Sequence, residues 1–192
     1  MHRTSRLLPS SLIASLFLVL AGIGTSAQAQ EHITIQANAR GTSTQLGKLL
    51  PVKIMIEQVS TPDEQKALID AFKRSGHEGM LDALTRMTPK GRVAVEGTVG
   101  NDVNYIRELP SKEGRRFRLV TDRNIAFGER YQGTRSSEYS IGAVELTITP
   151  DGKGSGTLLP ACKLKVNKQQ QIEIESYQNP WQLSDFIVDF GK

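Results

Sequence analysis

Residues 143–166 read AVELTITPDGKGSGTLLPACKLKV, and this stretch predicts two antiparallel β-strands joined by a tight turn. Before the turn, apolar and polar letters alternate in VELTI, and after it they alternate again in CKLKV. Alternation with a period of two is typical of a strand that buries one face and exposes the other to water. The stretch therefore predicts a β-hairpin.

The glycine-rich turn TPDGKGSGT raises the alternative of a phosphate-binding loop, which needs the motif G-x-x-x-x-G-K-S/T between a strand and a helix. Here Gly152 and Lys153 are followed by Gly154 in place of Ser or Thr, and strand alternation follows instead of a helix. Pro150 presets its own φ, Asp151 can bond back to the backbone, and Gly152 accepts a positive φ. We therefore expect the segment only to connect two strands.

Seven further segments have strand character: HITIQANA, VKIMIEQ, GRVAVEGTVG, DVNYIREL, RRFRLV, QIEIES and WQLSDFIVDF. One-sided alternation favours antiparallel pairing. The chain is therefore predicted to be mainly β, with eight to nine strands in an antiparallel β-sandwich or an open β-barrel.

Residues 61–87 follow helical periodicity instead and predict an α-helical hairpin inserted after the second strand. The first letters, TPDE, place Thr61 at the N-cap, with Glu64 completing a capping box. The pair Ser75-Gly76 ends the first helix, and apolar residues recur on one side of the second. We expect the hairpin to cover a sheet face or plug an open barrel end; the alternative is that its Met and Phe side chains line a ligand pocket.

The first 29 residues have the three parts of a secretory signal peptide. Arg3 and Arg6 make a basic start, the apolar run LIASLFLVLAGIG follows, and the segment ends in AQA. The apolar run has 13 residues; a spanning helix needs roughly 20, and an uncleaved anchor is the alternative. Ile23 stands where a lipoprotein signal needs Cys. We expect cleavage after Ala29 and a periplasmic or secreted protein with no membrane span in the mature chain.

Residues 30–192 are expected to form a single β-rich domain, large enough to bury a core without disulfides. The whole chain has 24 basic and 20 acidic residues, so without Arg3 and Arg6 the balance is 22 to 20, or +2. This charge gives no case for a nucleic-acid partner.

The single cysteine and the two histidines of the mature chain form no recognisable catalytic or metal motif. Cys162 alternates with apolar residues on one strand face, so we expect a packed thiol; a reactive or intermolecular thiol is the alternative. His32 and His77 lie in no H-x-x-x-H or H-E-x-x-H motif, and no G-x-S-x-G is present. We therefore assign no catalytic, cofactor-binding or metal-ligating residue, and no cofactor.

Seven arginines and Lys112 lie within residues 107–135. Arg116 and Arg118 are two apart on a strand, so their side chains leave one face about 7 Å apart, within reach of one anion. The residues expected to contact an anion or ligand are Arg116, Arg118, Arg123, Arg130 and Tyr131. The alternative is a solvated sheet face whose cations pair with four local carboxylates: Glu108, Glu113, Asp122 and Glu129. Residues 127–142, FGERYQGTRSSEYSIG, are expected to form a long polar loop that could provide a binding edge.

Two segments carry a resemblance: TPDEQKALIDAFKRSGHEGMLDAL, and YSIGAVELTITPDGKGSGTLLPACKLKV. Their order resembles that of uncharacterised secreted bacterial families, which have a signal peptide, a strand, a helical pair beginning T/S-P-x-E, and a β-rich remainder. The resemblance covers most of the mature chain. It implies no activity, and no functional residue is assigned from it.

Together these observations predict a non-enzymatic protein that binds a small apolar or anionic amphipathic ligand, or an acidic component of the cell envelope. The expected site is a cleft where the helical pair meets the sheet. Two alternatives remain: a secreted hydrolase whose site assembles only in three dimensions, and an interaction module that pairs through an exposed strand edge.

Overall fold

Nine strands and one interrupted helix make up the part of the chain that the computed structural model describes, which is residues 32–42, 46–125, 139–176 and 178–191. The strands are β1 (Ile33–Arg40), β2 (Leu49–Ile56), β3 (Gly91–Val95), β4 (Asn101–Leu109), β5 (Arg115–Thr121), β6 (Ile141–Ile148), β7 (Gly154–Val166), β8 (Ile172–Glu175) and β9 (Trp181–Phe190). The helix is α1 (Pro62–Thr85), between β2 and β3.

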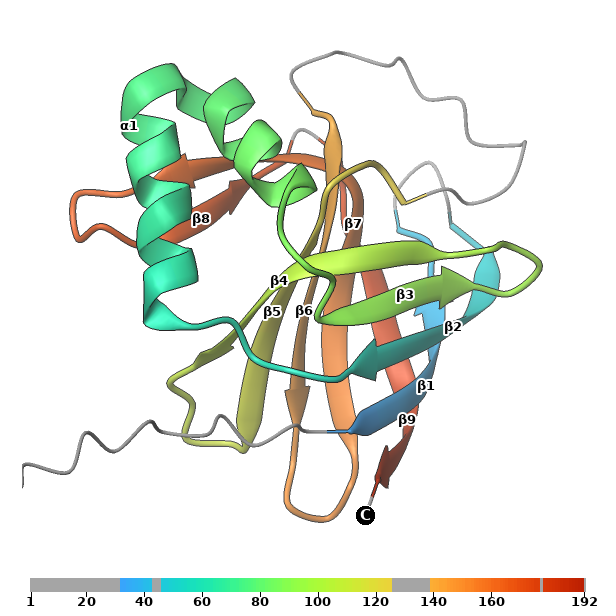
Figure 1. Cartoon of the computed structure of the whole chain (residues 1–192). Helices are drawn as coiled ribbons and strands as arrows, with labels where there is room; N and C mark the ends of the chain where they lie inside the picture. Colours follow the sequence, from blue (N-terminus) through green and yellow to red (C-terminus); the bar gives the residue numbers. More distant parts are fainter. Residues whose placement is uncertain (1–31, 43–45, 126–138, 177, 192) are drawn as a thin grey trace, which may run out of the picture.

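Eight of the strands close into an antiparallel barrel (Figure 1). Their order is β6-β5-β4-β3-β2-β1-β9-β7, and β7 pairs again with β6. Closure occurs at Gly156, which lies opposite Leu146 of β6 on one side and Leu183 of β9 on the other. The predicted mainly β, antiparallel fold of eight to nine strands is confirmed. Of the two predicted architectures the barrel forms, and it is closed because β7 has a partner on each side.

The hairpin between β6 and β7 is also confirmed. The two strands pair from Ile148 opposite Gly154, and the turn closes with hydrogen bonds from the Thr149 amide to the Lys153 carbonyl and from the Gly152 amide to the Thr149 carbonyl. Gly152 has a φ of 76°, which favours glycine. The glycine-rich segment therefore connects strands, as its sequence context predicts.

Side chains from all eight barrel strands fill the barrel interior. The largest are Trp181 and Phe117, both fully buried, and aliphatic residues at alternate strand positions complete the cluster. An eight-stranded barrel is just wide enough for its own inward side chains to fill. The interior is therefore the main hydrophobic core of the protein.

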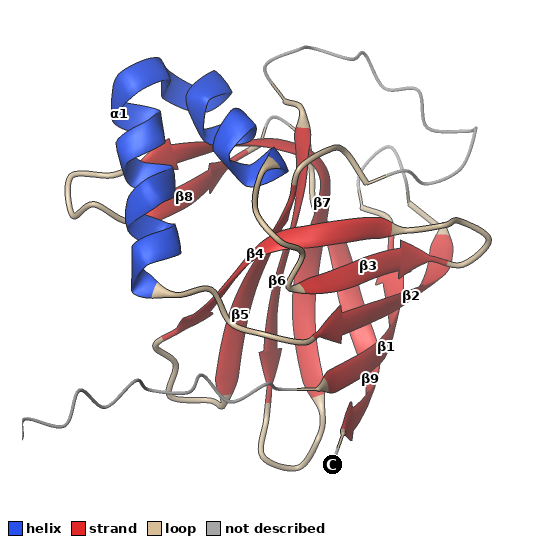
Figure 2. Ribbon diagram, viewed as in Figure 1, coloured by secondary structure: helices blue, strands red, loops and turns tan. Residues whose placement is uncertain are grey.

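A second core lies outside the barrel, where α1 covers the outer faces of β4 to β7 and the extra strand β8 (Figure 2). The far end of β7 leaves the barrel and pairs with β8, from Lys163 opposite Glu175 to Val166 opposite Ile172. The buried members of this second core come from the helix and from these strands: Leu68, Ile69, Met80, Leu84, Tyr105, Val120, Ile141, Ala143, Cys162, Leu164 and Ile172. The hairpin thus covers a sheet face, and its apolar stripes are packing surfaces.

The beginning and the interruption of α1 follow the sequence signals. The Thr61 hydroxyl accepts a hydrogen bond from the Glu64 amide, and the Glu64 carboxylate accepts one from the Thr61 amide at 2.7 Å, which completes the capping box. Ser75 and Gly76 have non-helical backbone angles, and Gly76 has a φ of 60°. The predicted helical hairpin is therefore present as two helical halves joined at these residues.

One ion pair fixes the start of α1 to the barrel. The Nζ of Lys90, whose side chain is 6% exposed, lies 2.8 Å from Glu64 Oε1. Burial raises the pKa of Glu64, but the hydrogen bonds and charge of Lys90 and the Thr61 amide outweigh it, so the pKa is lowered overall. Glu64 is therefore a carboxylate that serves the helix cap and the buried ammonium at once.

Replacing Glu64 with Ala is expected to lower the free energy of unfolding by about 3 kcal/mol, because it removes the capping box and leaves Lys90 buried without its partner. Equilibrium unfolding in urea measures the loss. The control is Glu78→Ala, an exposed residue in the second half of α1, which should cost less than about 0.5 kcal/mol. Equal losses in the two variants would contradict this role for the pair.

Candidate functional site

A polar groove of about 480 Å³ lies on the outer face of β5, β6 and β7. One wall is the turn between β4 and β5, with Lys112 and Glu113, and the floor includes Arg116 of β5 and Glu145 of β6. Ser155 and Thr157 of β7 complete the floor with short polar side chains. We call this surface the arginine groove.

Two arginines share one carboxylate in the arginine groove. Arg118 lies directly opposite Glu145 in the β5–β6 register. Its Nε and Nη2 lie 2.6 and 2.5 Å from Glu145 Oε1, and Arg116 Nη2 lies 2.8 Å from Oε2. Arg116 and Arg118 therefore converge on a carboxylate of the chain itself. This is the kind of ion pairing expected in the alternative interpretation of a solvated sheet face, although Glu145 is not among the four carboxylates expected there.

The two arginines have different surroundings. Arg118 is 17% exposed and also donates from Nη1 to the backbone carbonyl of Ile172, which ties β8 to the barrel. Arg116 is 44% exposed, and among the described residues its one hydrogen bond is that from Nη2 to Glu145. A guanidinium has five N–H donors in a planar fork. Arg118 therefore has a structural role, whereas Arg116 has further N–H donors that face the groove.

The charge of Glu145 is held by its two neighbours. Burial raises the pKa of this carboxyl, but hydrogen bonds from Arg116 and Arg118 and the positive charge of both outweigh it, so the pKa lies below its usual value. Glu145 is consequently ionised at neutral pH, and the arginines are oriented by a fixed negative charge.

The remaining predicted site residues lie apart from this groove or outside the described part of the chain. Arg123 is exposed beyond the end of β5 and does not line the groove. Arg130 and Tyr131, with most of the polar loop 127–142, lie outside the described residues. Of the four carboxylates expected as ion-pair partners, Glu108 pairs with Arg115 at 2.6 Å.

Sequence reasoning missed Glu145 and Lys112 as parts of the site. Glu145 is a polar letter within the alternation VELTI, which places it on the outward face of its strand. This alternation indicates that Glu145 faces outward, but it does not indicate which strand lies beside β6. The pairing of β6 with β5 brings Glu145 beside Arg118, and the two residues are far apart in the sequence. Lys112 lies in a turn, where alternation carries no information.

A Ser–His pair between α1 and the segment preceding β6 has a bearing on the hydrolase alternative. His77 Nε2 lies 3.2 Å from Ser140 Oγ, but His77 Nδ1 accepts a hydrogen bond from the Leu164 amide at 3.3 Å. Because Nδ1 is an acceptor, the proton of the neutral ring is on Nε2, which then donates to the serine. In a Ser-His-Asp triad the tautomer is the opposite one, with Nε2 free to take the serine proton. His77 therefore connects the helical hairpin to β7 and to the segment preceding β6, and the Ser–His pair lacks the arrangement of a nucleophile and its base.

Three other properties bear on possible function. Cys162 is buried, and burial raises the pKa of its thiol to about 12. Within the described ranges, no group of three or more His, Cys, Asp and Glu side chains is placed to hold a metal ion. No helix in the same ranges combines the length and apolar character needed to cross a membrane.

Comparisons with protein-family models, with curated proteins and with solved structures found no match.

Replacing Glu145 with Gln is expected to lower the free energy of unfolding at neutral pH by about 1–2 kcal/mol, because the charged hydrogen bonds from Arg116 and Arg118 are weakened. The folded-state pKa is below the unfolded value, so this stabilisation is complete above the ordinary pKa of 4.5 and is lost as the pH falls through the lowered one. Urea unfolding of the unaltered protein and of Glu145→Gln across this pH range should show that their difference in free energy of unfolding decreases as the pH falls. Glu113→Gln is the control at the rim of the groove, and a pH-independent difference for Glu145→Gln would contradict the account.

The Cys162 thiol is expected to resist alkylation by iodoacetamide in the folded protein, because only the thiolate reacts and burial keeps the group protonated. Mass spectrometry should show full labelling in guanidinium chloride and almost none under native conditions. Rapid labelling of the native protein would show that the thiol is accessible and reactive.

Proposed function

We propose that this protein is a periplasmic or secreted, non-enzymatic binding protein that takes an anionic amphipathic ligand in the arginine groove. Its location rests on the basic start, apolar run and AQA ending of residues 1–29. The anionic group of the ligand would be a carboxylate or phosphate, the two groups that a guanidinium fork matches best.

The observation that carries the proposal is the half-exposed Arg116 guanidinium at the groove floor. Glu145 holds it through one nitrogen, while Arg118 already supplies Glu145 with two close donors. Lys112 adds a second cation on the groove wall. Three cations therefore surround two carboxylates, Glu145 and Glu113, and an incoming anion would neutralise the remaining positive charge.

The packed interior supports the anionic amphipathic ligand over the purely apolar one. A purely apolar molecule needs an apolar cavity, and the barrel interior is occupied by its own side chains. The arginine groove is mainly polar and lies on the outside. The proposal therefore places the anionic head of an amphipathic molecule in the groove and its apolar part on the neighbouring outer surface.

The test uses protein purified from the periplasm of its own host, whose intact mass should correspond to a chain beginning at Gln30. Dodecyl phosphate is titrated into it by isothermal calorimetry. Arg116→Gln should weaken binding about tenfold, because it removes a charged donor to the phosphate, and Lys112→Gln should weaken it less.

The matched control is Lys73→Gln, an exposed lysine on α1 with the same change of charge, which should leave the affinity unchanged. Dodecyl maltoside, a neutral amphiphile with the same chain, should not compete. Equal weakening by Lys73→Gln, or equally tight binding of the neutral amphiphile, would overturn the proposal.

A further inference from the structure

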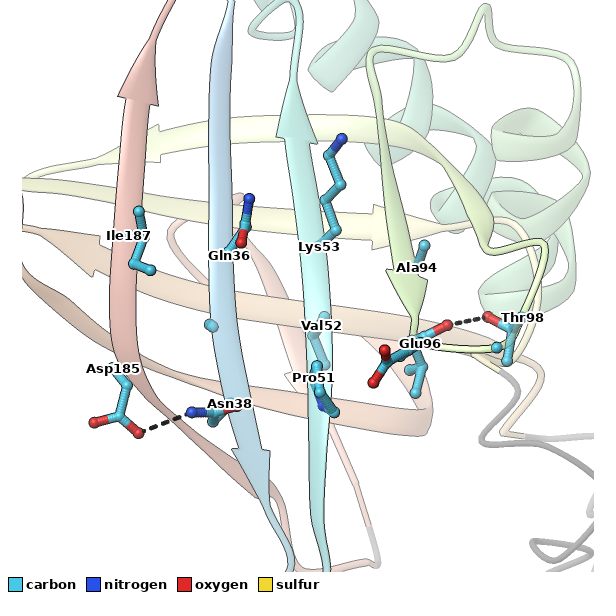
Figure 3. A pocket seen from close by; sticks show the side chains of 13 residues that line it. Gln36, Asn38, Pro51, Val52, Lys53, Ala94, Glu96, Thr98, Asp185 and Ile187 are labelled. Carbon is cyan, nitrogen blue, oxygen red and sulfur yellow. Dashed lines mark hydrogen bonds between the residues drawn. The ribbon is translucent and has the colours of Figure 1, made fainter.

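A second hollow, of about 380 Å³, lies on the outer face of β9, β1, β2 and β3, away from the arginine groove (Figure 3). The strand register places its side chains in rows. One row contains Ile187, Gln36, Lys53 and Ala94, each on a different strand. Four adjacent strands span about 14 Å, three times the inter-strand spacing. The hollow is thus elongated across the strands.

An irregularity in β9 shapes one end of this hollow. The β1–β9 register shifts between Gln36 and Asn38, so β9 has an extra residue there. Asp185 lies at this bulge with a φ of 57°. Few non-glycine residues adopt such a backbone, although Asp is one that tolerates it. The bulge directs the Asp185 side chain onto the outer face, where it lies beside Asn38 (Figure 3).

The Asp185 carboxylate is oriented through one of its two oxygens. Asn38 Nδ2 donates to Oδ2 at 3.2 Å, and the Ser184 hydroxyl donates to the same Oδ2 at 2.9 Å. Oδ1 accepts no hydrogen bond from the described residues. These two bonds also lower the pKa of Asp185, so the group is an ionised acceptor. One oxygen is therefore fixed in place and the other is available to a ligand.

The hollow combines acceptors, donors and an apolar surface. Glu96 lies at the end opposite Asp185 and adds acceptors, while Gln36 and Lys53 bring donors to the neighbouring row of the hollow. Ile187 is 67% exposed and lies beside Gln36. A hydroxyl group both donates and accepts, so a row of hydroxyls on a ring with apolar faces matches this set.

We propose that this hollow binds a neutral oligosaccharide, with Asp185 and Glu96 accepting from its hydroxyl groups at the two ends. Lys53 lines the same hollow from the neighbouring row, and its positive charge disfavours a cationic ligand. The two carboxylates equally disfavour an anion. Neutral hydroxyl groups satisfy both kinds of side chain at once, and the elongated shape favours a chain of sugar rings over a single ring.

The experiment is a titration of the isotopically labelled protein with cellotriose and with maltotriose, followed in two-dimensional amide NMR spectra. At least one sugar should shift amides of β9, β1 and β2 around the hollow and leave those of β5 and β6 unchanged. Asp185→Gly should weaken binding at least fivefold. Glycine accepts the positive φ, so this variant keeps the backbone of the bulge.

The matched control is Asp189→Asn, an exposed carboxylate on the same strand that does not line the hollow, and it should bind as the unaltered protein does. Gln36→Ala provides a second test on a different strand and should also weaken binding. No shift with either sugar, or equal weakening by Asp189→Asn, would overturn the proposal. So would binding of trilysine, but not of sugars, with the same dependence on Asp185, because it would identify a cation site.

Discussion

The structure depends on the double pairing of β7. Gly156 has β6 on one side and β9 on the other, and a Cβ at this position would lie 2.4 Å from the Glu145 carbonyl oxygen. Only glycine allows so close an approach without a shift of the backbone. The same strand then leaves the barrel and pairs with β8, where it forms the surface that α1 covers. Barrel closure and the position of the helix therefore originate in a single strand.

Closure also determines which surfaces the proposed ligands can reach. Once eight strands surround the core, inward side chains such as Trp181 occupy the interior, and polar chemistry is confined to the outer face. Two of the hollows in the described part of the chain lie on this face, one over β5 to β7 and one over β9 to β3. The proposed functions follow from the charges that line these two surfaces.

Much of the fold could be predicted from local patterns. Alternation identified the strands, TPDE identified the capping box, and Ser75-Gly76 marked the interruption of α1. The bulge at Asp185 also has a sequence signal: in WQLSDFIVDF the apolar letters change phase between Leu183 and Phe186.

Closure could not be predicted, because alternation gives the face of each strand but not its neighbours. For the same reason the spacing of Arg116 and Arg118 predicted that both side chains leave one face, while their pairing with Glu145 required the β5–β6 register.

Trp181 offers the most direct test of the central claim, that the barrel interior is filled and ligands bind outside. It is the single tryptophan of the chain and is fully buried in the interior. Its fluorescence should be measured while dodecyl phosphate is added to saturation. The account predicts an emission maximum and intensity that do not change, because the ligand lies on the outer face. A spectral shift or quenching that saturates with the ligand would contradict it, since the ligand would then have entered the barrel.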